Sequence, residues 1–282
     1  MLAKLLKYDF RSLRRFGVPI ILALLVTTVL GTINMLTLVY NIESMALAPN
    51  DPSFLQTVTT MASVGMMAVI FVAIAAAVTG MQVLICVDFY KSLVSDEGYL
   101  TFTLPVKAQD ILRSKLINAS VWSLIIGVAS VLAMVIMFFA GIIPLVGWQE
   151  FFDAFAWPNI GEEYVVDVIM MLVLGLLIAV ISFVNTQLLY FMAIFFASVI
   201  ARKHKVLAAI GCVYGVNMLY GILTSIAMPI ISIFAALLGL RAENPLAVTN
   251  LTMLIGCVLL TGLNILFYYL TKYMMEKKLN LA

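Results

Sequence analysis

The sequence has few charged residues and almost no side chains suited to catalysis. Only 11% of its 282 residues are charged, and it contains a single histidine, His204. A catalytic or metal-binding histidine needs partner residues that the sequence does not supply, so we interpret His204 as a solvated residue of a basic loop. A glycine-rich loop followed by Lys and Ser or Thr is also missing, which excludes nucleotide binding through a Walker site. We therefore expect no enzyme, no catalytic residue, no metal, no cofactor in this chain and no nucleic-acid partner.

Apolar side chains, in contrast, are abundant. Hydrophobic residues make up 64% of the chain and the mean hydropathy is +1.14, more than a soluble fold of this size can bury. The three cysteines lie inside apolar segments without the spacing of a metal site, so we interpret them as small packing residues. We predict one all-α polytopic membrane domain over residues 1–282. Its six transmembrane helices are predicted at 17–40, 58–87, 117–143, 165–200, 206–228 and 249–271.

Two further segments accompany these spans. Residues 1–16 are predicted to form an amphipathic helix in the membrane interface, because apolar side chains fall on one side and five bases on the other. Asp9 is out of place on the apolar side. It either pairs with an Arg or Lys of a neighbouring element or is an inert carboxylate that reaches solvent. Residues 229–240 are apolar but too short to cross the bilayer alone, and they are bounded by Pro229 and by Asn244-Pro245. This pattern favours a re-entrant or outer segment over 229–245, before the last span.

The basic residues predict how the chain is oriented. Fifteen of the sixteen lie in the N-terminal segment, the 88–116 stretch, the 202–205 loop and the C-terminal tail. The remaining loops carry one base, Arg241, and eight acids. This alternation predicts six spans with both termini in the cytoplasm.

The longest polar interruption between apolar segments is the cytoplasmic stretch 88–116. It contains four acids and four bases around a cluster of helix-breaking residues, Gly98 and Leu104-Pro105. A helix is predicted to stop near Gly98 and to restart after Pro105, because proline cannot continue a helix. The stretch keeps apolar residues such as Leu100 and Phe102, so we expect it to pack against a separate soluble protein.

Polar residues inside the predicted spans are the other candidates for function, because their burial in lipid is costly. They either line a substrate route or form hydrogen bonds between helices. No span contains a central Asp, Glu, Lys or Arg, which disfavours a proton- or sodium-coupled transporter. The residues considered for a translocation pathway are Thr28, Asn34, Asn185, Gln187, Asn217 and Tyr220.

These features together resemble a known family. The amphipathic N-terminal helix, the six spans, the long first cytoplasmic loop and the segment before the last span are similar to the membrane subunit of ABC-2 type (type V) ABC transporters. The stretch Ser95-Asp-Glu-Gly-Tyr-Leu-Thr-Phe-Thr-Leu-Pro-Val106, followed by Ile111-Leu-Arg-Ser-Lys115-Leu116, resembles the loop of bacterial permeases of this family, particularly from Gram-positive lineages.

The resemblance implies a coupling helix in this loop, seated in a cleft of a separate ATPase. The residues that it assigns to coupling and docking are Asp96, Glu97, Gly98, Tyr99, Leu104, Pro105 and Lys107. Asp96 and Glu97 could instead cap a helix or simply be solvated. The resemblance further implies two ATPase subunits with ATP and magnesium, a second permease copy or paralogue, and a bacterial plasma membrane.

The function expected from the residues and the resemblance is export of an amphipathic or lipophilic substrate, such as an antimicrobial peptide, a lipid or a drug. The alternative is a membrane sensor or scaffold that docks a cytoplasmic partner and transports nothing. Both would use the same loop.

Overall fold

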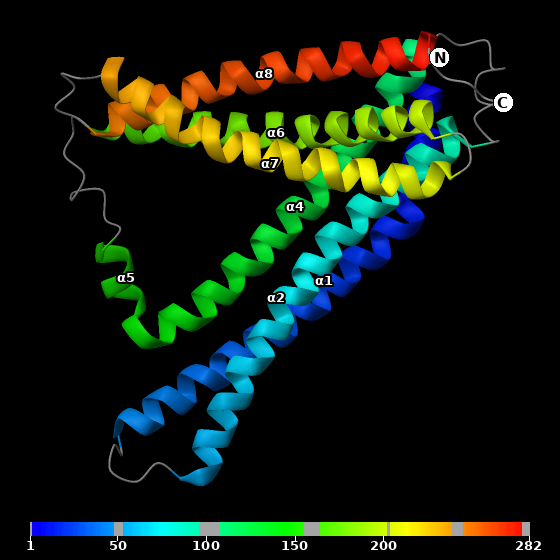
Figure 1. Cartoon of the computed structure of the whole chain (residues 1–282). Helices are drawn as coiled ribbons and strands as arrows, with labels where there is room; N and C mark the ends of the chain where they lie inside the picture. Colours follow the sequence, from blue (N-terminus) through cyan, green and yellow to red (C-terminus); the bar gives the residue numbers. More distant parts are fainter. Residues whose placement is uncertain are drawn as a thin grey trace. The chain divides into compact units, whose positions relative to one another are not determined.

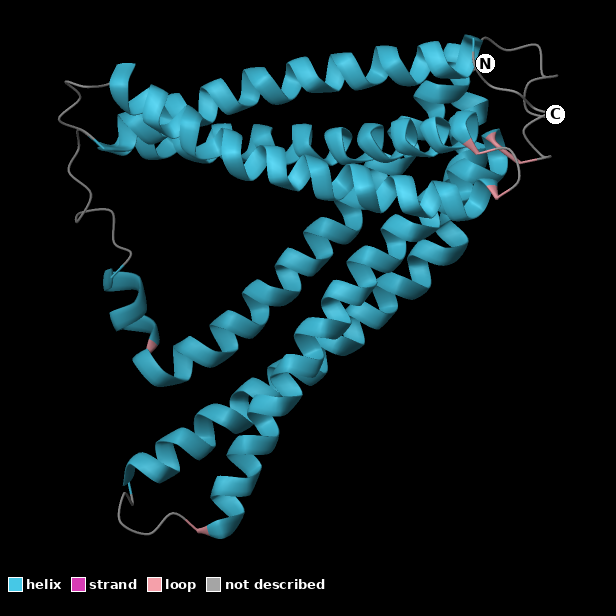
Figure 2. Cartoon of the chain, viewed as in Figure 1, coloured by secondary structure: helices cyan, strands magenta, loops and turns pink. Residues whose placement is uncertain are grey.

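The computed structural model describes residues 2–47, 53–95, 108–154, 164–201, 204–238 and 245–277. Within these ranges the regular structure is helical and no strand occurs (Figure 2). The helices are α1 (Leu2–Leu47), α2 (Phe54–Leu93), α4 (Ala108–Val146), α5 (Trp148–Ala154), α6 (Val165–Ile200), α7 (Lys205–Leu238) and α8 (Pro245–Lys277) (Figure 1). All of these except α5 are long and apolar enough to cross a membrane, six in total. The prediction of an all-α chain with six helices of spanning length is confirmed.

The helices form two compact units. The first, which we call the α6–α8 unit, comprises Met1–Arg11, Ile85–Val121 and Ile160–Ala282. The second, which we call the α5 unit, comprises Ser12–Leu84 and Trp122–Asn159. Helices α1, α2 and α4 therefore contribute residues to both units.

In the α6–α8 unit, α6 packs against both α7 and α8. Asn250 of α8 donates its side-chain amide to the carbonyl of Asp167 at 3.0 Å, and Asn264 donates to the carbonyl of Ile181 at 3.2 Å. Both pairs are separated by 83 residues, so α8 runs parallel to α6 in constant register. Helix α7 connects them in the opposite direction (Figure 1). Each carbonyl gives a side-chain amide the hydrogen-bond acceptor that lipid does not offer.

Aromatic packing joins the end of α2 to this unit. The ring of Phe89 stacks on that of Phe191 of α6, with centroids 3.6 Å apart and planes 4° apart. Phe195 approaches the same ring edge-on, at 5.2 Å. All three side chains are at most 1% exposed, so they form a solid apolar core at the point where α2 ends.

In the α5 unit, α1 and α2 are antiparallel neighbours. Asn34 of α1 donates to the carbonyl of Ser63 at 2.9 Å. Further along α1, Asn41 donates to the hydroxyl of Thr59 at 3.2 Å. Glycine lets α1 approach α4 closely, because a Cβ at Gly17 would collide with the buried indole ring of Trp122. This unit is therefore held by hydrogen bonds from asparagine side chains between helices and by close packing of α1 against α4 at Gly17, as is usual in membrane bundles.

Several helix boundaries differ from the predictions. The segment 1–16 is not a separate helix, since α1 continues without interruption from Leu2 through Pro19 to Leu47. Helix α7 likewise continues through Pro229 to Leu238, so the predicted outer segment 229–245 does not begin at the proline. In lipid a break would leave backbone groups without partners, and continuing the helix avoids that cost. Residues 239–244 lie outside the described residues.

The polar stretch 88–116 is shorter than predicted, because α2 extends to Leu93 and α4 begins at Ala108. Helix α5 was not predicted at all. It follows Gly147, whose φ of 82° is a left-handed conformation suited to glycine, and whose N–H bonds to the carbonyl of Ile143 at 2.9 Å. This turn ends α4 and starts α5.

Gly17→Ala is expected to lower the free energy of unfolding by about 1–3 kcal/mol, because the new methyl group would overlap the ring of Trp122. The matched control is Gly65→Ala on α2, where a Cβ would meet nothing within 4 Å. That control should be neutral or slightly stabilising, because alanine favours a helix over glycine. The measurement is the midpoint of thermal unfolding of the purified proteins in one detergent. Equal midpoints for Gly17→Ala and the wild type would contradict the close α1–α4 contact.

Candidate functional site

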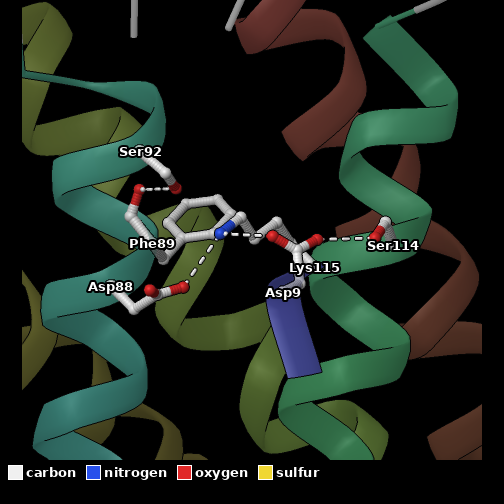
Figure 3. Close-up of polar contacts among 6 residues, drawn as sticks. All are labelled: Asp9, Asp88, Phe89, Ser92, Ser114 and Lys115. Atoms are coloured by element: carbon white, nitrogen blue, oxygen red, sulfur yellow. Dashed lines mark hydrogen bonds and ion pairs between the residues drawn. The ribbon is translucent and has the colours of Figure 1, made fainter. Parts of the chain in front are cut away.

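A group of charged side chains lies buried in the α6–α8 unit where α1, α2 and α4 meet (Figure 3). The ammonium group of Lys115 on α4 lies 2.9 Å from Asp9 Oδ1 on α1 and 2.9 Å from Asp88 Oδ2 on α2. The hydroxyl of Ser114 donates to the other oxygen of Asp9 at 2.6 Å. We call Asp9, Asp88, Ser114 and Lys115 the Lys115 cluster.

The Lys115 cluster is largely shielded from its surroundings. The side chains of Lys115, Asp9 and Asp88 are 9%, 16% and 21% exposed, and Ser114 is fully buried. Buried charges are tolerated when they are paired and hydrogen-bonded, and are strongly destabilising when one partner is missing. Since each charged residue comes from a different helix, the cluster is stable only while α1, α2 and α4 keep this mutual arrangement.

The local sequence explains why Lys115 turns inward. Ile111, Leu112, Ser114 and Lys115 are all buried, and their spacing of three and four residues places them on one face of α4. The apolar members of this face direct it into the unit, and Lys115 follows because it shares their side of the helix.

Favourable charges and backbone bonds also define the ends of α2 and α4. Lys91 lies in the last turn of α2 and Asp110 in the first turn of α4, each opposite in sign to the helix dipole at that end. Helix α2 closes through the N–H of Val94, which bonds to the carbonyl of Tyr90 at 2.9 Å. The chain therefore leaves α2 and re-enters α4 at defined points, on either side of residues 96–107.

A second polar contact links α4 to α8. The guanidinium of Arg113 donates to the hydroxyl of Tyr268 at 3.2 Å. The first two turns of α4 are thus attached to α1 and α2 through the Lys115 cluster and to α8 through Arg113. Movement of the start of α4 would have to move or break these contacts.

The predicted coupling residues are not placed by the structure. They are Asp96, Glu97, Gly98, Tyr99, Leu104, Pro105 and Lys107, and all lie outside the described residues. Their role remains a prediction from the sequence.

The predicted pathway residues do not gather in one unit. Thr28 and Asn34 belong to the α5 unit, and the other four belong to the α6–α8 unit. The hydroxyl of Thr28 bonds to the carbonyl of Leu24 in its own helix at 2.7 Å, and Asn34 joins α1 to α2. For Asn34 the observed contact is therefore the interhelical hydrogen bond that was the alternative to a pathway role.

The four residues of the α6–α8 unit differ in burial. On α6, Asn185 is 2% exposed and Gln187 is fully buried. On α7, Asn217 is exposed and Tyr220 is half-buried. The side-chain nitrogen of Asn185 is buried and has no hydrogen-bond partner among the described residues. A pathway role for these four residues remains a prediction.

Sequence reasoning missed most of the Lys115 cluster. It treated Asp88 and Lys115 as part of a polar loop and gave Ser114 no role. The available signal was Asp9, an acid on the apolar side of its helix, for which pairing with a neighbouring base was one of two interpretations. That interpretation is confirmed by the ion pair with Lys115.

The arrangement is suited to holding helices together rather than to bond-making chemistry. The Lys115 cluster combines one ammonium group, two carboxylates and one hydroxyl that donates to a carboxylate. In the part of the chain that the structure describes, no three His, Cys, Asp or Glu residues are grouped so as to bind a metal ion. The fold and this cluster define an all-α membrane protein with several helices of spanning length and a buried ionic contact that joins three of them.

The chain was compared with known proteins. No family model matches it, and no curated protein or solved structure is significantly similar to it.

Lys115→Met is expected to lower the free energy of unfolding by about 3–5 kcal/mol, because it leaves two partly buried carboxylates without their cation. The matched control is Lys91→Met, which removes an exposed base of α2 and should change stability by at most about 0.5 kcal/mol. Stability is measured by titrating the purified protein in mixed micelles with sodium dodecyl sulfate.

A variant without any of the three charges, Asp9→Asn with Asp88→Asn and Lys115→Met, should recover a large part of the lost stability, because no buried charge then lacks a partner. If Lys115→Met were as stable as Lys91→Met, the buried ionic contact would be contradicted.

Proposed function

We propose that this chain is the membrane-spanning permease subunit of an ATP-driven exporter of the ABC-2 type. It works in a bacterial plasma membrane, with both termini in the cytoplasm. A separate ATPase hydrolyses ATP, and this chain converts the movement of the ATPase into a change in its helices. Two ATPase subunits and a second permease copy or paralogue complete the transporter.

The observation that carries this proposal is the Lys115 cluster. It lies on both sides of residues 96–107, since Asp88 belongs to the helix before them and Lys115 to the helix after them. Asp9 adds the N-terminal helix to the same contact. A force on residues 96–107 would reach three helices through short ionic contacts, which is the connection that a coupling element requires.

The charge distribution supports the proposed orientation. Helices α6 and α8 are parallel and α7 is antiparallel, as expected for three consecutive spans. Fifteen of the sixteen bases fall in segments that this topology assigns to the cytoplasm. Residues 96–107 are then on the side where a cytoplasmic ATPase would meet them.

The first test is an affinity purification of the tagged protein from native membranes in mild detergent, followed by mass spectrometry. We expect a soluble ATPase in stoichiometric amount. Replacing residues 96–107 by a Gly/Ser linker of equal length should abolish its recovery, whereas the same replacement at 48–52, in a predicted outer connection, should not. Recovery of the protein alone, or with a sensor kinase in place of an ATPase, would contradict the proposed function and favour the sensor or scaffold. Recovery of the ATPase with the 96–107 linker would keep the transporter but contradict this docking segment.

The double substitution Glu97→Ala and Tyr99→Ala should separate ATP hydrolysis from transport. We expect hydrolysis of ATP by the reconstituted complex to continue while export falls by at least about tenfold. The reason is that the ATPase would change conformation without the contact that transmits its movement to the permease. The ratio of cargo exported to phosphate released is the quantity to measure. A wild-type ratio in the double variant would remove these two residues from the coupling contact.

A further inference from the structure

The α5 unit contains a cavity of about 710 Å³ that none of the residues considered so far lines. Its wall consists of four methionines, five phenylalanines and one valine. Met35 comes from α1, Met67 from α2, Met137 from α4 and Phe151 from α5, so four helices build it. Its volume falls within the roughly 300–1,000 Å³ that is usual for small-molecule sites.

The side chains that line the cavity favour a hydrocarbon ligand. A cavity holds water only when polar groups can bind it, and every lining side chain here is apolar. Methionine is flexible and polarisable and adapts to ligands of different shape, and phenylalanine contributes a large apolar area. Phe138 and Val135 of α4 line the cavity and are 53% and 40% exposed, so the cavity is open beside α4. Because α4 is apolar enough to span a membrane, this opening would face lipid.

Helix α5 gives the cavity an amphipathic rim. Phe151 packs edge-on against Phe139 of α4, with centroids 5.5 Å apart, and Trp148 stacks on Phe152 at 5.8 Å. The three aromatic residues of α5 share one face, because they are three and four residues apart. Exposed tryptophan is typical of the boundary between lipid and water, so α5 marks the depth at which a ligand would change from apolar to polar.

The charges on α5 and at the end of α1 are acidic. Glu150 and Asp153 occupy the opposite face of α5 and are exposed, and Glu43 is exposed near the end of α1. Among the described residues of the α5 unit, the only bases are Arg14 and Arg15. Arg15 lies 20 residues before Met35 in the same helix, about 30 Å away along its axis, which is several screening lengths at physiological salt. Within the described part of the α5 unit, the charges on α5 and at the end of α1 are therefore all acidic, so a positively charged headgroup there would meet no like charge of this unit.

We propose that this cavity binds the hydrocarbon chain of a cationic amphiphile, with the cationic headgroup held at the acidic side of α5. As a cargo site it rests on the export function proposed above and names the class of cargo. As a binding site it concerns this chain alone. It lies within the α5 unit and needs neither the ATPase nor the Lys115 cluster.

The experiment uses three photoreactive probes with the same alkyl-diazirine chain and a trimethylammonium, phosphocholine or sulfate headgroup. The purified chain is placed in phosphatidylcholine nanodiscs without ATPase, and the labelled peptides are identified by mass spectrometry. The trimethylammonium probe should label the peptides that carry Met35, Met67 and Phe151. Competition by dodecyltrimethylammonium, but not by dodecyl sulfate, should remove this label.

Two substitutions test the two parts of the site. Val135→Trp fills the cavity and should weaken labelling about tenfold, a change that one misfitting group produces in an apolar pocket. The matched control is Val131→Trp, one turn earlier on α4, where the side chain is 58% exposed and does not line the cavity. The double substitution Glu150→Gln and Asp153→Asn should reduce the preference for the cationic probe by about two- to fivefold and leave chain binding intact. If Val135→Trp fails to fold, Met134→Trp is the second cavity-filling variant.

Equal labelling by all three probes would overturn the cationic class, and labelling that Val135→Trp and Val131→Trp affect equally would overturn the site. Both results are independent of the recovery of an ATPase. Loss of this site would leave the proposed permease standing, and failure to find an ATPase would leave the binding result standing.

Discussion

The ionic contact of Lys115 with Asp9 and Asp88 is the constraint on which the arrangement of α1, α2 and α4 depends. Each charge belongs to a different helix, and each is costly to bury alone. The three helices must therefore meet in one register or expose these groups again. The stacked rings of Phe89 and Phe191 and the bond from Arg113 to Tyr268 extend the same constraint to α6 and α8. An ionic contact of this kind is weak evidence for high stability, because replacing it by well-packed apolar residues is often neutral or stabilising.

The two units solve the problem of a lipid solvent in different ways. In the α6–α8 unit, asparagines of α8 bond to carbonyls of α6 at two points with a constant separation of 83 residues. In the α5 unit, a hydrogen bond from the side-chain amide of Asn34 joins α1 to α2, and Gly17 allows α1 to lie close to Trp122 of α4. The α5 unit also retains a large apolar cavity. The first arrangement fixes register, and the second leaves room for a ligand. The proposed exporter would use both properties, a part that transmits movement and a part that accepts cargo.

Much of the fold could be predicted from the sequence. Long apolar runs specify helices in lipid, because only a helix satisfies its own backbone bonds there, and all six spans were located in this way. The continuity of α1 was missed because its first part is amphipathic and the rest is apolar, so the two parts suited different environments. The continuity of α7 was missed because Pro229 was interpreted as a boundary, although helices in lipid tolerate proline. Helix α5 was missed because its seven residues are too few to give a clear period. The candidate site was only partly predictable, since Asp9 stood out but its partners are remote in the chain.

The sequence by itself determined that the chain suits a lipid solvent and that six of its helices are long and apolar enough to cross a membrane, because these properties depend on composition and on local periodicity. Only the tertiary structure decided that Lys115 pairs with Asp9 and Asp88, which lie 106 and 27 residues earlier in the chain. It also decided that methionines and phenylalanines of four helices line one open cavity. Contacts of this kind depend on which faces of distant helices meet. A single helix cannot specify them, because its apolar residues suit lipid and protein neighbours equally well.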